Sequence, residues 1–320
     1  MRSNESKPTA VRQAMPLLGA AAGIALVIGC VHRIDTQALL EATRLALPWA
    51  PLLLALEGLR ILSEAYATRL LIRSESIPLS LVVRLQLVSN ACSAILPAGR
   101  LAGEALKVAN FAPLVGSARA TAIGVVNQVL SLLASGIVSL TAAAAALLLS
   151  PRREIAVALV VNASLLVAAA VFIQLAARGG WVQRLTRRFP RVRAAAANFQ
   201  SAASLGSLVP LGPALVFIVG RLAQVMLFVV LFAALADRWN PLYALLAQGL
   251  TLVAATVADA VPAQMGATEY ALMTAAPDLG ISAATALSMA LVFRAAQLFW
   301  AFTGALVAAS FRPRASVVTS

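Results

Sequence analysis

The chain has 320 residues, of which 61% are hydrophobic and 12% are charged, and its formal net charge is +13 at pH 7. A soluble core of this size cannot cover so much apolar surface, whereas a lipid bilayer accepts it, so the composition excludes a soluble protein. The Lys and Arg residues lie in short segments between apolar runs. We therefore expect contact with anionic lipid headgroups and no nucleic-acid partner.

Apolar stretches follow one another along the whole chain, and a transmembrane helix needs roughly 20 such residues. The candidates are 14–31, 47–68, 81–98, 101–116, 118–149, 154–177, 209–236, 242–262, 265–277 and 282–309. The pair on either side of Pro97 and Gly99 is short, and so is the pair on either side of Pro262. Each of these pairs is either a full span followed by a surface helix or a re-entrant hairpin that enters and leaves the membrane on one side.

Basic residues distinguish the two alternatives, because they concentrate on the cytoplasmic side of membrane proteins. They lie in the N-terminus, in a segment containing Arg69, Arg73 and Arg84, in an Arg-rich run at 177–193 and in the C-terminal tail. If 81–98 crossed the membrane, Arg84 and the Arg-rich run would lie on opposite sides. We therefore predict an all-α polytopic protein with about six full spans, two re-entrant helical hairpins that open to opposite sides, and both termini in the cytoplasm.

The two helix breaks are similar in sequence. The first reads ILPAGRLAGEALKV and the second AVPAQMGATEYALM, and the spacing from Pro97 to Glu104 equals that from Pro262 to Glu269. Interrupted helices at corresponding positions of two inverted repeats are typical of a transport site near the bilayer midplane. The sequence thus predicts a single membrane domain over 1–320, with repeat one at about 14–149, repeat two at about 154–309 and a cytoplasmic basic amphipathic connector at 178–205.

The breaks also carry a family resemblance. The first contains Pro97, Arg100, Leu101, Gly103, Glu104 and Lys107, and the second contains Pro262, Gly266 and Glu269. In this pattern the chain resembles the lysylphosphatidylglycerol synthase transmembrane region and its flippase-like relatives. The second motif departs from the pattern where Ala263 and Gln264 replace residues that are often glycine. The resemblance implies a stand-alone member without the soluble synthase domain, and an anionic, polyprenyl or hopanoid-type lipid as cargo.

Charged side chains at bilayer depth cost roughly 2.5–3.5 kcal/mol each on insertion scales, so each is a candidate for function. Arg100, Glu104 and Lys107 recur on one helix face. They form either a salt-bridged stripe at the cytoplasmic mouth or a site in which Arg100 and Lys107 bind a lipid phosphate. Glu269 has no basic neighbour in its own hairpin, so its expected partner is Arg294 or Arg221. The predicted structural breaks are Pro97, Gly99, Gly103, Pro262 and Gly266.

Other polar residues lie in the predicted spans. Glu57, Arg60 and Glu64 have helical spacing and form either a structural clamp or a wall of the headgroup path. Asp259 is a further candidate carboxylate just before the second break. We expect seven amide residues to join helices rather than to bind ligands: Gln86, Asn90, Asn127, Gln128, Gln224, Gln248 and Gln297.

These features predict a lipid flippase or transporter of the bacterial inner membrane that is not an enzyme. One alternative is an intramembrane lipid-modifying transferase or phosphatase, with Glu104 and Glu269 as acid and base. A second is a lipid-binding accessory subunit of a lipid-biosynthesis enzyme. The single histidine, His32, leaves no histidine cluster for a metal and no Ser-His relay. We expect no cofactor and no metal.

Overall fold

A computed structural model of the chain describes residues 36–72, 77–95, 99–178, 209–259, 264 and 266–310. All regular structure in these ranges is helical. In chain order the elements are α2 (Thr36–Ala46), the 3-10 turn η1 (Leu47–Trp49), α3 (Ala50–Ile72), α4 (Leu79–Ile95), α5 (Gly99–Val115), α6 (Ser117–Leu149), α7 (Arg153–Arg178), α10 (Leu211–Ala236), α11 (Pro241–Val257), α12 (Ala267–Thr274) and α13 (Ala283–Ser310).

Five helices are long and apolar enough to cross a membrane, which confirms a polytopic all-α protein. They correspond to the predicted spans at 47–68, 118–149, 154–177, 209–236 and 282–309. The predicted span at 14–31 lies outside the described residues, as do both termini and nearly all of the connector at 178–205. Helix α2, which precedes α3, was not predicted, because Glu41 and Arg44 interrupt its apolar pattern.

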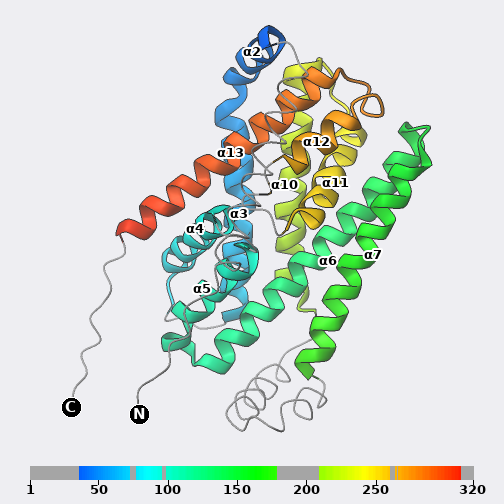
Figure 1. Ribbon diagram of the computed structural model, residues 1–320. Helices are drawn as coiled ribbons and strands as arrows, with labels where there is room; N and C mark the ends of the chain where they lie inside the picture. The colour runs from blue at the N-terminus through cyan, green and yellow to red at the C-terminus, as the bar shows by residue number, and fades with distance from the viewer. Residues whose placement is uncertain are drawn as a thin grey trace, which may run out of the picture.

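The first predicted hairpin consists of α4 and α5, which pack against each other. A buried apolar cluster that includes Ile72, Val82, Phe111 and Ile123 joins the end of α3, the start of α4, the end of α5 and the start of α6. Arg119 of α6 also donates a 2.7 Å hydrogen bond to the carbonyl of Ile72. The hairpin therefore begins and ends at the same end of the bundle, the lower end in Figure 1.

The second hairpin consists of α11 and α12 and opens at the other end (Figure 1). Ser150, just after α6, donates a 2.6 Å hydrogen bond to Asp278, which lies between α12 and α13. Arg238, just before α11, donates to the carbonyl of Gly280 at 3.1 Å. These contacts place the start of α11 and the end of α12 together at the upper end, so the two hairpins open toward opposite ends.

Helix packing follows one pattern in both halves of the chain. Helices α3 and α10 pack against each other, α4 packs against α13, and α11 packs against α6. If α3 to α6 are matched in order with α10 to α13, the contact of α4 with α13 corresponds to that of α11 with α6. The contact of α3 with α10 corresponds to itself. Each hairpin is thus held by the last long helix of the other half.

Glycines permit the close approaches and turns near the breaks. A Cβ atom at Gly103 would lie 2.5 Å from Ser89 Oγ, so only glycine lets α5 approach α4 this closely. Gly266 precedes α12 with a φ of 82°, a conformation that disfavours other residues. Gly99 is buried and begins α5, whereas Pro97 and Pro262 lie outside the described residues.

Candidate functional site

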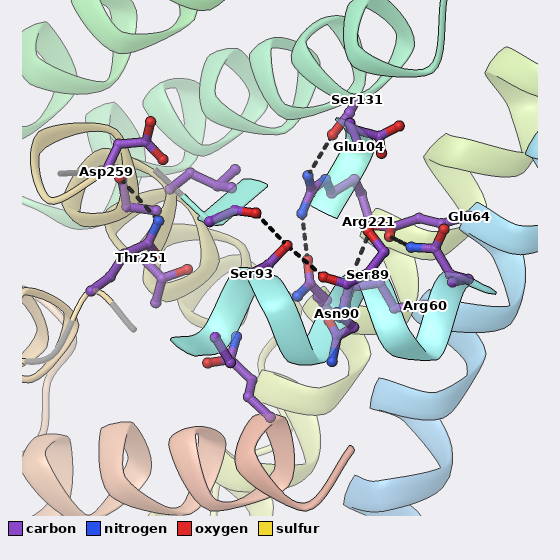
Figure 2. Close-up of a pocket in the computed structure, with 18 of the residues that line it drawn as sticks. Arg60, Glu64, Ser89, Asn90, Ser93, Glu104, Ser131, Arg221, Thr251 and Asp259 are labelled. Atoms are coloured by element: carbon purple, nitrogen blue, oxygen red, sulfur yellow. Dashed lines mark hydrogen bonds and ion pairs between the residues drawn. The ribbon is translucent and has the colours of Figure 1, made fainter. Parts of the chain in front are cut away.

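A polar cavity of about 220 Å³ lies between the two hairpins and is also lined by α3, α6, α10 and α13. Figure 2 shows Arg60 and Glu64 on one side of it and Thr251 and Asp259 on the other. Polar residues at consecutive turns of α4 lie between these two sides (Figure 2): Ser89, Asn90 and Ser93. The cavity therefore brings together helices from both halves of the sequence.

Arg60 is held between two carboxylates of its own helix. Its Nε lies 2.8 Å from Glu57 Oε1, and its Nη1 lies 2.8 Å from Glu64 Oε1. It also donates a 3.1 Å hydrogen bond to Asn90 of α4. Arg60 and Glu64 line the cavity, whereas the fully buried Glu57 is not part of the wall. The triplet thus acts both as the predicted clamp and, in two of its members, as a cavity wall.

A chain of polar contacts continues from α3 through α4 to α5. Gln86 donates to Glu64 Oε2 at 2.7 Å and accepts from Lys107 Nζ at 2.9 Å. Lys107 also pairs with Glu104, with Nζ 2.5 Å from Oε1. The ammonium of Lys107 is therefore already coordinated inside the protein, as the salt-bridged alternative predicts. Arg100 lies in the first turn of α5, and its side chain is outside the described part of the chain.

The second half has a related polar chain built around Arg221 of α10. Arg221 donates to Gln224 Oε1 at 2.8 Å and to Ser131 Oγ of α6 at 3.3 Å. The same Gln224 oxygen accepts a 3.3 Å hydrogen bond from Gln248 of α11. Each half thus contains an arginine on a long helix, a hydrogen-bond acceptor on the same helix and a glutamine on the hairpin.

Arg294 of α13 is the partner of Glu269. Its Nε and Nη2 lie 3.0 and 3.3 Å from the two carboxylate oxygens, and Nη2 also donates to the carbonyl of Gln264 at 3.1 Å. Only 1% of Glu269 is exposed. Arg294 lines the cavity and Glu269 does not, so Glu269 pairs with a guanidinium of the wall from behind it.

The structure distributes the predicted site residues in three groups. Gly99 and seven charged residues line the cavity: Arg60, Glu64, Glu104, Lys107, Arg221, Asp259 and Arg294. Glu57, Glu269, Gly103 and Gly266 are described but lie outside its wall. Pro97, Pro262 and the side chain of Arg100 are outside the described part.

The seven amide residues expected to join helices all line the cavity. Some also form the expected helix contacts: Asn127 of α6, for example, donates to Thr68 Oγ1 of α3 at 2.9 Å. A signal that could have identified two of them as site residues is their matching position in the two hairpins. Gln86 and Gln248 stand at the same position counted from the start of α4 and α11.

The cavity is suited to a polar group rather than to a purely apolar one. Lys107, Arg60 and Arg294 each contact a carboxylate, so much of the charge on the wall is compensated within the protein. Neutral amide and hydroxyl groups make up most of the remaining polar wall. Such a surface offers hydrogen-bond donors and acceptors to a polar group.

Comparison with known proteins identifies one family. The family model described as lysylphosphatidylglycerol synthase TM region matches residues 16–305, which is nearly the whole chain. Searches of curated proteins and of solved structures found no match.

Proposed function

Because the chain belongs to the family of the lysylphosphatidylglycerol synthase transmembrane region, we propose that it moves the polar headgroup of a membrane lipid between the leaflets of the bacterial inner membrane. The observation that carries this proposal is the polar cavity that lies between two hairpins that open to opposite ends of a membrane bundle. In this proposal the protein catalyses no covalent step, and its cargo is an anionic, polyprenyl or hopanoid-type lipid.

Matching positions in the two halves support an inverted repeat as the basis of transport. Arg60 and Arg221 stand at the same position counted from the start of α3 and α10. Gln128 of α6 and Arg294 of α13 also stand at matching positions, and so do Gln86 and Gln248 in the hairpins. All six residues line the cavity. A site built from equivalent residues of inverted halves can open to either side by moving one half against the other.

The energetic task of such a protein is to replace headgroup hydration. A polar group that enters hydrocarbon without hydrogen bonds costs several kcal/mol. The cavity presents guanidinium, amide and hydroxyl groups at membrane depth, while the acyl chains of the cargo remain in the bilayer. The affinity for the cargo must be low enough for release on either side of the membrane. The ion pairs within the protein keep the affinity moderate, because the cations of the wall are already paired with carboxylates.

The test is leaflet exchange in proteoliposomes that contain the purified protein and one lipid labelled with a fluorophore on its hydrocarbon chain. Dithionite added outside bleaches only the outer leaflet, so exchange raises the bleached fraction above about half. We expect exchange with the parent protein and at least a tenfold slower rate for Glu104→Gln and Glu269→Gln. Glu154→Gln, at the exposed first turn of α7, is the matched control and should exchange at the parent rate.

The proposal fails if the parent protein exchanges no labelled lipid faster than empty liposomes, across phosphatidylglycerol, cardiolipin and polyprenyl phosphate probes. It also fails if both glutamine variants match the parent. Mass spectrometry of the same liposomes would reveal a modified lipid, which would support the intramembrane enzyme instead.

A further inference from the structure

Two buried amide oxygens have no hydrogen-bond partner among the described residues. They are Asn127 Oδ1 on α6 and Gln248 Oε1 on α11, and their residues are only 2% and 1% exposed. Both residues line the cavity, and so does Glu104, whose buried Oε2 also lacks a partner. Buried polar atoms in native proteins are nearly always hydrogen-bonded, so these three need an explanation.

The surrounding network fixes which atom of each amide is the oxygen. The Thr68 hydroxyl donates to the carbonyl of Glu64, so its oxygen is the acceptor for Asn127 Nδ2. Gln224 Oε1 accepts from Arg221, so the atom of Gln248 that faces it is the donor Nε2. In both residues the atom left over is therefore the carbonyl oxygen, an acceptor.

The cavity thus lacks hydrogen-bond donors rather than acceptors. A phosphate group supplies only acceptors and leaves all three oxygens unpaired. An ammonium group supplies donors, but it would enter a wall that already carries Arg60, Lys107 and Arg294. Glu64, Glu104 and Glu269 are engaged with those same cations, and Asp259, the remaining carboxylate of the wall, is exposed. A neutral hydroxyl group supplies a donor without adding charge.

We propose that the cavity is a binding site for a lipid headgroup rich in hydroxyl groups, whose hydroxyls donate to Asn127 Oδ1 and Gln248 Oε1. The two acceptors lie on different helices, α6 and α11, so a polyol or sugar with several hydroxyls satisfies them better than a single small group. The inference rests on the proposed function in one respect, because the headgroup must enter the cavity from the membrane.

The test measures binding rather than transport, so that it can fail independently of the proposed function. Purified protein in an amine-oxide detergent, whose headgroup carries no hydroxyl, is mixed with equal amounts of phosphatidylglycerol and phosphatidylethanol of identical acyl chains. Native mass spectrometry then gives the ratio of the two bound lipids. Both headgroups carry one phosphodiester charge, and only the first carries hydroxyls. We expect about a tenfold preference for phosphatidylglycerol, as two neutral hydrogen bonds provide.

Substitutions that remove the acceptors should reduce this preference. Gln248→Met and Asn127→Leu keep approximate side-chain size, and each should lower the ratio about threefold or more. Asn162→Leu is the matched control, since Asn162 is an equally buried amide that donates to Ser139 Oγ at 2.9 Å away from the cavity. Its ratio should equal that of the parent. Because each ratio is internal to one preparation, unequal yields do not affect it.

Equal binding of phosphatidylethanol by the parent would overturn the inference, and so would a preference that survives in both variants. Stronger binding of phosphatidylethanolamine than of phosphatidylglycerol would also overturn it and would favour a cationic headgroup. If the protein exchanges lipids between leaflets but shows no hydroxyl preference, the proposed function stands and only this inference fails.

Discussion

Arg60 illustrates how single residues keep buried charge tolerable in this protein. Glu57 is fully buried and its carboxylate contacts Arg60, which at the same time contacts Glu64. Removing one partner of a buried ion pair usually destabilises strongly, because the remaining charge stays buried without compensation. One guanidinium is therefore shared by two carboxylates of a single helix.

Replacing this guanidinium should therefore be costly. We expect Arg60→Met to lower the free energy of unfolding by about 3 kcal/mol, since two carboxylates lose their shared partner. Urea or SDS unfolding of the purified protein measures the change. Arg69→Met, near the end of the same helix, is the control and should change it by less than about 1 kcal/mol. Equal changes in the free energy of unfolding for the two substitutions would contradict a stabilising role of these ion pairs.

At the scale of elements, ion pairs also connect the ends of the helices. Asp278, in the turn between α12 and α13, accepts hydrogen bonds from Ser150 at 2.6 Å and from Arg152 at 3.1 Å. The side chain of Asp278 is 1% exposed, whereas that of Arg152 is 48% exposed. The contact fastens the second hairpin to the turn between α6 and α7.

This difference in exposure predicts unequal effects of the two partners. Arg152→Met leaves a buried carboxylate and should lower the free energy of unfolding by about 2 kcal/mol, whereas Asp278→Asn leaves an arginine that reaches water and should cost about half as much. The same unfolding measurement compares them. A larger loss for Asp278→Asn than for Arg152→Met would contradict the explanation.

The sequence was sufficient to predict most of the described elements, although it missed α2. Apolar length predicted five described spans, and the parity of the basic segments along the chain predicted the two hairpins. The sequence was less informative about the site. Whether Gln248 faces the lipid, another helix or a cavity depends on the rotation of α11 against α10 and α6, and tertiary packing alone determines that rotation.

The charged partners were predictable only in part for the same reason. Arg294 was one of two candidates for Glu269, since few cations lie at that depth. The ion pair of Lys107 with Glu104 follows from their spacing on α5, whereas its contact with Gln86 depends on the close approach of α4 and α5 that Gly103 permits.

At the scale of the whole molecule, the two ends of the bundle should face opposite sides of the membrane. Single cysteines in a protein lacking both native cysteines test this with an impermeant thiol reagent applied to intact cells. Pro151→Cys and Pro277→Cys, both exposed at the upper end, should react, and Ser117→Cys and Val209→Cys at the lower end should not. Reaction of one residue from each end would contradict the predicted orientation, and permeabilised cells provide the control for reactivity.

The central claim is that one cavity between oppositely oriented hairpins is reached in turn from both sides of the membrane. Ser89→Cys on α4 and Thr251→Cys on α11 test it most directly, because these residues stand at the same position counted from the start of their helices and both line the cavity. Each is treated with an impermeant thiol reagent in right-side-out and in inverted membrane vesicles. Ser135→Cys, buried on α6 outside the cavity wall, is the control and should stay unreacted in both. We predict that both cavity cysteines react in both kinds of vesicle, whereas reaction from one side only would contradict the claim.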